Sequence, residues 1–138
     1  MRDDRGSVTL WVLGLTVVIL GFGGMALDFW RALATQREVA GIADAASVAA
    51  AGGIDEEYYR ATGLIRLHPS RARSLGMASV ESQGTDLMSV VIAVASDGSS
   101  VQIEIVDEVF VGLLGFFIGD DEPLTVRAFS TAEPVLVP

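Results

Sequence analysis

The chain has 138 residues, a formal net charge of −9 and a mean hydropathy of +0.49. This length suits one small domain plus an anchor. The absence of Cys excludes disulfides, Cys-based zinc sites and thiol nucleophiles, and the acidic balance argues against nucleic acid as a partner, because phosphate binding needs basic surface.

The first predicted element is an apolar helix. Residues 7–27 contain no charged side chain, and at about 1.5 Å per residue they extend roughly 30 Å, the thickness of a bilayer core. We therefore predict a transmembrane helix here, with 1–6 as a short cytoplasmic leader and the remainder extracytoplasmic. Two alternatives stay open: a buried core helix, and a cleaved secretory signal with a small-x-small site at Gly24-Met25-Ala26.

The helical pattern continues past the apolar run. No Pro occurs between 28 and 51, and apolar residues recur at helical spacing, namely Leu33, Val39, Ile42, Ala46 and Ala49. Gly52-Gly53 provides a stop, so 7–51 are predicted as one helix, with 28–53 as its extension beyond the membrane. A row of small residues four apart lies on this extension: Gly41, Ala45, Ala49 and Gly53. The row predicts either close packing with helices of other subunits or packing on the chain's own sheet.

Residues 54–138 are predicted to form a small domain, and its first part is helical. The acidic run Asp55-Glu56-Glu57 favours a solvated helix start over a cation site, and Pro69-Ser70 opens a second helix to about Val80. A modest basic cluster is interpreted as a solvated face, with contact to anionic lipid headgroups as the alternative. Its members are Arg60, Arg66, His68, Arg71 and Arg73.

A β-hairpin is the clearest local pattern. Two β-rich segments, 87–95 and 99–106, flank Asp97-Gly98, which is a preferred two-residue turn. With this turn, three apolar pairs share one face, while Gln102 and Glu104 lie on the other. The pairs are Val94 with Val101, Ile92 with Ile103 and Val90 with Ile105. This register predicts a sheet buried on one side.

The apolar segment 109–119 is too short to span a membrane. We predict a short helix or turn packed under the sheet, with a membrane-touching or partner-binding patch as the alternative. Asp120-Asp121-Glu122-Pro123 then favours a loop over a metal site. A third strand is expected over 124–132, with Leu124, Val126 and Ala128 on one face, which gives an α+β domain with a three-stranded antiparallel sheet.

No nucleotide-binding loop, metal-ligand set or nucleophile–base spacing occurs in the sequence. We therefore predict no catalytic residue, no cofactor and no metal. Two functions other than a membrane-anchored component stay open: a secreted binding domain cut near Ala26, and a membrane-bound hydrolase that uses His68 and the acidic clusters.

The N-terminal residues carry a family resemblance. The segment Arg5-Gly6-Ser7-Val8-Thr9-Leu10-Trp11, the apolar run, and the small-residue stretch around Ala43-Asp44-Ala45-Ala46 resemble TadE/TadG-like proteins of bacterial tight-adherence (Flp) pili and related secretion systems. The tail VGLLGFFIGDDEPLTVRAFSTAE resembles the closing loop and final strand of the same family. The resemblance covers about residues 4–53 well and the rest loosely.

The resemblance implies a pilin-like architecture and a non-enzymatic minor pilin or pseudopilin that assembles with other pilin-like proteins through its N-terminal helix. Prepilin-type members are cut after a Gly, which here would be Gly6, leaving Ser7 first. Those members carry Glu at the fifth mature position, where this chain has Trp11. This departure leaves two expectations open: processing with assembly, or permanent anchoring in the bacterial cell membrane.

Overall fold

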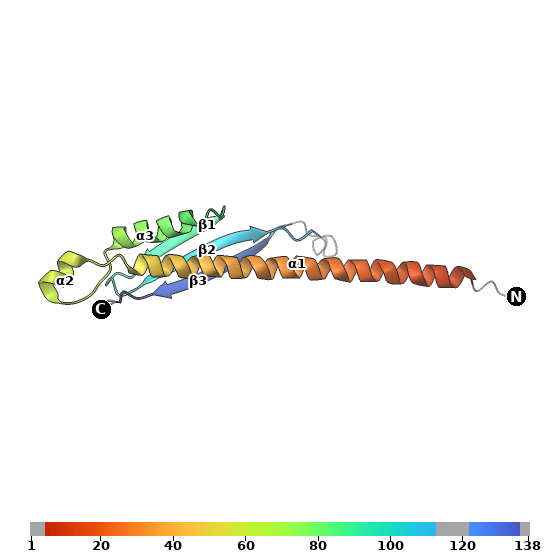
Figure 1. The fold of residues 1–138 in the computed structure, drawn as a ribbon, viewed down its shortest axis with the longest axis horizontal. Helices are drawn as coiled ribbons and strands as arrows, with labels where there is room; N and C mark the ends of the chain where they lie inside the picture. The colour runs from red at the N-terminus through yellow and green to blue at the C-terminus, as the bar shows by residue number, and fades with distance from the viewer. Residues whose placement is uncertain (1–4, 113–121, 136–138) are drawn as a thin grey trace. The chain divides into compact units, whose positions relative to one another are not determined.

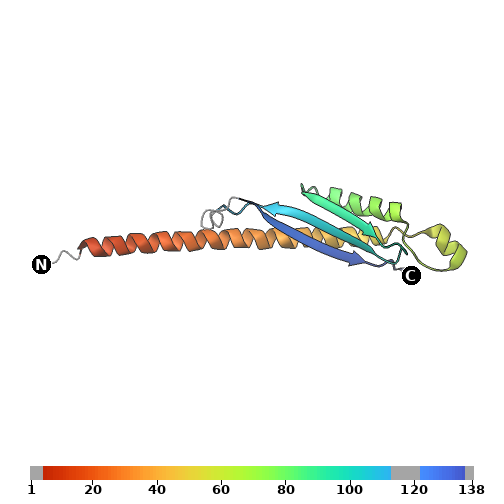
Figure 2. The same cartoon turned by 180° about the vertical axis from the view of Figure 1, so that it is seen from behind.

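The computed structural model describes residues 5–112 and 122–135. Three helices, α1 (Arg5–Ala51), α2 (Glu56–Thr62) and α3 (Pro69–Ser82), precede three strands. These are β1 (Ser89–Val94), β2 (Val101–Val109) and β3 (Leu124–Ala132), which form one antiparallel sheet in the order β1-β2-β3 (Figure 2). The predicted α+β fold, with a long N-terminal helix and a three-stranded antiparallel sheet, is confirmed.

The chain divides into two compact units. The N-terminal unit comprises Met1–Ala34 and Val109–Leu124, and the head unit comprises Thr35–Glu108 and Thr125–Pro138. Helix α1 contributes its first part to the N-terminal unit and its second part to the head unit. Among the described residues, α1 is the one helix long and apolar enough to cross a membrane.

Helix α1 ends where the sequence predicts. The amides of Gly52 and Gly53 donate to the carbonyls of Ala49 and Ala50, at 3.1 and 2.9 Å, so the last turn is tightened before the chain leaves the helix. Gly53 is also required by packing. A Cβ at this position would lie 2.6 Å from the backbone nitrogen of Ala72 in α3, a distance that no side chain tolerates.

The core of the head unit lies between one face of the sheet and two helices. The second part of α1 and all of α3 cover this face (Figure 1), and the opposite face carries exposed residues such as Val91, Gln102 and Phe129. Gly76 of α3 permits the close approach, because a Cβ there would touch side chains of Ile92 and Ala50. The fully enclosed members of the core include Val39, Ile42, Ala46, Ala50, Leu67, Val101, Ile103 and Ile105.

The predicted hairpin register is confirmed, but the predicted turn is wrong. Val90 pairs with Ile105, Ile92 with Ile103 and Val94 with Val101. A further pair of residues, Ala95 and Ser100, is joined by a 2.9 Å backbone hydrogen bond, so the loop consists of residues 96–99 rather than two residues.

The loop geometry explains why the turn differs. Type I′ turns need positive φ at both central residues, and here only Gly98 has one, at 72°. The Asp97 carboxylate instead accepts hydrogen bonds from the Ser99 amide at 2.9 Å and the Ser99 hydroxyl at 2.7 Å. The Gly98 carbonyl accepts from the Leu67 amide at 2.8 Å, so a contact with a distant segment shapes this loop.

The predicted third strand begins at Leu124. Of the three residues predicted to share one face, Val126 and Ala128 are buried and Leu124 is 42% exposed. Strand β2 extends to Val109, so the short helix or turn predicted from 109 does not begin there. Most of the predicted element, and Asp120-Asp121 of the predicted loop, fall within 113–121, outside the described residues.

Candidate functional site

The first part of α1 exposes apolar side chains on nearly every side. Every residue from Val8 to Leu20 is exposed, and the residue that follows, Gly21, is half-buried. Large side chains dominate this surface, and Trp11 is 77% exposed. A helix that is apolar all round needs apolar surroundings. Water does not provide them, so this segment is suited to a lipid bilayer or to a bundle of similar helices.

One face of α1 in the N-terminal unit is covered. Gly24 and Asp28 are buried, and Gly21, Met25 and Ala32 on the same helical face are half-buried. The Asp28 side chain is only 5% exposed, and the Arg31 guanidinium lies 4.0 Å from its carboxylate, while Arg31 itself is 70% exposed. The one acidic group close behind the apolar run is therefore enclosed by protein.

The small-residue row divides into two parts. Gly41 and Ala45 are exposed, Ala49 is half-buried, and Gly53 is buried against α3. A Cβ added to Gly41 would meet nothing within 4 Å, so the chain's own fold does not require a glycine there. Val48, one turn beyond Ala45, is 70% exposed and apolar. The outward part of the row thus presents a strip of small side chains with Val48, and the exposed Asp44 lies beside it.

The opposite face of the same helix segment packs on the sheet. Val39, Ile42 and Ala46 are buried there, and Ser47 reaches across to the last strand, where its Oγ lies 2.9 Å from Ser130 Oγ. Ser47 Oγ also donates to the Asp44 carbonyl at 2.9 Å, so this buried hydroxyl is satisfied. Sheet packing therefore uses different positions from Gly41 and Ala45.

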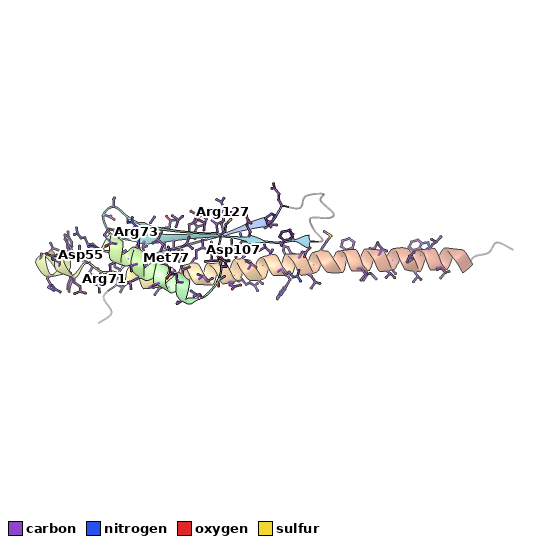
Figure 3. The ribbon with its side chains drawn as sticks, turned by 90° about the horizontal axis from the view of Figure 1, so that it is seen from above. Asp55, Arg71, Arg73, Met77, Asp107 and Arg127 are labelled. Atoms are coloured by element: carbon purple, nitrogen blue, oxygen red, sulfur yellow. The ribbon has the colours of Figure 1, made fainter. Side chains whose placement is uncertain are left out.

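The predicted acidic run is the start of α2. Asp55 is the N-cap residue, and its carboxylate accepts a 3.0 Å hydrogen bond from the Tyr58 amide. The same carboxylate binds Arg66 through two hydrogen bonds, of 2.8 and 3.0 Å. The Tyr58 amide first, and the Arg66 guanidinium second, hold the pKa of Asp55 below its usual range. Figure 3 shows Asp55 close to α2.

The predicted basic cluster is largely neutralised by this run. Glu56 accepts from Arg60 at 3.0 Å and from Arg71 of α3 at 3.0 Å, and the Arg66 guanidinium also stacks over the Tyr58 ring at 3.7 Å. Figure 3 labels Arg71 and Arg73 on α3. The arrangement ties α2 to α3, and it provides no uniform basic surface for anionic headgroups.

Sequence reasoning missed these contacts, and it also missed the pairing of His68 with Ser70. The Ser70 hydroxyl lies 3.0 Å from His68 Nδ1, where α3 begins. Both residues line a shallow polar hollow with Glu56 and Arg71. Nucleophilic catalysis also needs a group that orients the base, and within 5–112 and 122–135 no carboxylate is hydrogen-bonded to His68. Since the two residues are neighbours at a helix start, the contact is a local one.

The remaining predicted sites concern metal binding and the processing of the N-terminus. In the described part of the chain, no group of three or more His, Cys, Asp and Glu residues is arranged to hold a metal ion. Gly6 and Ser7, the expected processing residues, lie in the first turn of α1. Trp11 lies one turn further along the same helix.

Comparison with known protein families gives a match to the N-terminal part of the chain. Residues 6–53 match the family model described as "Putative Flp pilus-assembly TadE/G-like". No curated protein and no solved structure matches the chain. The matched residues coincide with α1 and the two glycines that end it. The long helix is thus the part of this chain that matches the TadE/G-like family of Flp pilus assembly.

Proposed function

We propose that this chain is a non-enzymatic minor pilin or pseudopilin of a Flp pilus or related secretion apparatus, in which α1 is both the membrane anchor and the assembly element. Residues 7–27 cross the bacterial cell membrane, 28–53 extend the helix outward, and 54–138 complete an extracytoplasmic domain. One observation carries the proposal: the family match over 6–53 falls on α1, which runs without a break from Arg5 to Ala51.

The exposure of α1 supports the anchoring role. Its first part places apolar side chains outward, and the apolar surface is almost wholly uncovered by the rest of the chain. Burying such a surface in lipid removes it from water at about 25 cal/mol per Å². A soluble protein that kept this surface exposed would aggregate.

The outward strip of the head unit supports the assembly role. Gly41, Ala45 and Ala49 let a second helix approach closely, and Val48 adds apolar area beside them. This part of α1 is free for partners because the sheet uses the opposite face. Gly53 belongs to the internal packing against α3 and not to the proposed strip.

Membrane fractionation and the mature N-terminus test the anchoring. The protein should stay in the membrane pellet through carbonate and high-salt washes, and mass spectrometry should find a start at Ser7 or an intact N-terminus. A start at Ser7 indicates prepilin-type processing despite Trp11. Release by carbonate, or a start at Leu27, would contradict the anchor and favour the secreted domain.

Substitutions on the strip test the assembly. Gly41→Leu and Ala45→Leu add bulk where the chain's own fold leaves space, so neither should lower the unfolding midpoint of the head. Cross-linked oligomers in native membranes should decrease strongly. Gln36→Leu is the matched control, because Gln36 is exposed on α1 but off the strip. Unchanged cross-linking in both strip variants would remove this surface from the proposal.

A further inference from the structure

The sequence holds two tryptophans, and both lie on α1. Trp11 is 77% exposed and Trp30 is 64% exposed. They are 19 positions apart along one continuous helix, so at about 1.5 Å per residue their levels differ by about 28 Å. This separation matches the thickness of a bilayer's hydrocarbon core, about 30 Å.

Tryptophan favours the boundary between lipid and water, because its ring is apolar and its indole N–H needs a polar partner. A helix with one exposed tryptophan at each end of a bilayer-length segment therefore has two anchors. Between them, the exposed side chains are apolar, for example Leu15, Ile19 and Phe22, except that of Thr16, whose hydroxyl donates to the Val12 carbonyl at 2.8 Å.

One charged residue lies between the two tryptophans, and it is Asp28. Charges on a lipid-facing surface are costly, and on sequence alone Asp28 ends the apolar run at Leu27. In the structure its side chain is 5% exposed. At 100° per residue, two positions place Trp30 about 200° from Asp28, on the opposite side of the helix. The lipid-facing side therefore stays uncharged past Asp28.

The first charged side chain exposed after this segment is that of Arg31, directly after Trp30. Arginine at the end of a span extends its charged group to the headgroup layer. From these observations we propose that the bilayer occupies α1 from Trp11 to Trp30, with the two indoles at opposite lipid–water boundaries and Asp28 shielded from lipid by protein. The proposal rests on the anchoring role above and moves the outer end of the span from Leu27 to Trp30.

Tryptophan fluorescence in the full-length protein tests this placement directly. Trp11→Phe and Trp30→Phe each leave one native tryptophan. Two reference proteins carry both changes plus a new tryptophan, either Leu20→Trp, midway between the native pair, or Gln36→Trp, about 9 Å beyond Trp30 along the helix. Each protein is reconstituted in phosphatidylcholine vesicles that contain brominated lipid, with bromine either near the headgroup or deep in the acyl chain.

Both native tryptophans should be quenched more by shallow than by deep bromine. The Leu20→Trp reference should show the reverse, and the Gln36→Trp reference should be unquenched with water-like emission. Trp30 behaving like Gln36→Trp would overturn the proposal and return the boundary to Leu27. Trp30 quenched as deeply as Leu20→Trp would overturn it by extending the span further.

The experiment separates this placement from the anchor itself. If Leu20→Trp is quenched but Trp30 is not, the anchor stands and the placement fails. If no tryptophan, including that of Leu20→Trp, is quenched by either lipid, the helix is not inserted and both proposals fail. Strong deep quenching of Trp11 would also overturn the placement, because the inner boundary would then lie before it.

Discussion

The two parts of α1 differ both in how apolar they are and in where their apolar residues lie. The part in the N-terminal unit has apolar residues all round, and most of them are exposed. In the head unit, α1 buries Val39 and Ile42 on the face that packs on the sheet. Its other faces expose the charged Arg37 and Glu38, and Val48 is the large apolar residue exposed there. The average hydropathy of each part and the pattern around the helix both indicate whether lipid or protein covers it.

Replacing one apolar residue by Asp in each part of α1 tests this difference most sharply. Ile42→Asp buries an unpaired charge in the core of the head and should abolish its cooperative unfolding, because such a charge costs several kcal/mol. Leu20→Asp should leave the head folded but reduce membrane integration, at a cost of about 2.5–3.5 kcal/mol if position 20 is at the centre of the bilayer.

Circular dichroism of the purified protein and carbonate extraction of membranes measure the two effects. Leu20→Ala is the control for the membrane part, since it shortens the side chain without adding charge. If Leu20→Asp destabilised the head while Ile42→Asp released the protein from membranes, the assigned environments would be reversed.

One cross-strand pair of the hairpin combines a fully buried residue with a half-buried one. Ile103 is fully buried and Ile92, its cross-strand partner, is half-buried. Ile103→Ala should lower the free energy of unfolding by about 2–5 kcal/mol, and Ile92→Ala should cost less. Denaturant titration measures both. Equal losses would show that the two sides of the pair are equally enclosed.

A smaller effect is expected at the hydroxyl pair that joins α1 to β3. Ser47→Ala removes the contact with Ser130 and should cost about 0.5–1.5 kcal/mol. Ser130→Ala and the double variant complete a double-mutant cycle, in which the two losses should not add. Additive losses would mean that the hydroxyls do not depend on each other.

The smallest effect concerns pH. Because Asp55 has a lowered pKa in the folded state, its ionised form stabilises the fold at pH values above its unfolded pKa of about 4, and this stabilisation is lost as the pH falls through the folded pKa. Asn also caps helices, so Asp55→Asn removes mainly the charge that binds Arg66. The stability difference between the native protein and the variant should be constant near neutrality and shrink below about pH 4. A difference that does not vary with pH would exclude the carboxylate as its source.

Local patterns in the sequence are sufficient to predict the helices and strands, but not to predict the contacts between them. The apolar run, the absence of Pro and the Gly52-Gly53 pair predict α1 to within two residues of its observed start. Alternating residues predict the hairpin register. The loop at 96–99 was mispredicted because Leu67, far away in the sequence, binds the Gly98 carbonyl.

In the candidate site, too, the sequence predicts the kinds of residues but not the contacts between them. Residue type predicted a small-residue row, but only the packing reveals that Gly53 contacts α3 while Gly41 does not. The sequence predicts an acidic cluster and a basic cluster, but it does not show that Glu56 contacts Arg71, fifteen positions later. The burial of Asp28 has no sequence signature either, so the sequence alone ends the apolar run at Leu27.

The order of the strands has a consequence for synthesis. Within the head, the second part of α1 is synthesised first. The strands that cover its apolar face, β2 and β3, are synthesised last. At about 5–20 residues per second, that face waits for seconds before its cover exists. A chain arrested before Val101 is therefore expected to present Val39 and Ile42 uncovered, as a target for chaperones and membrane proteases.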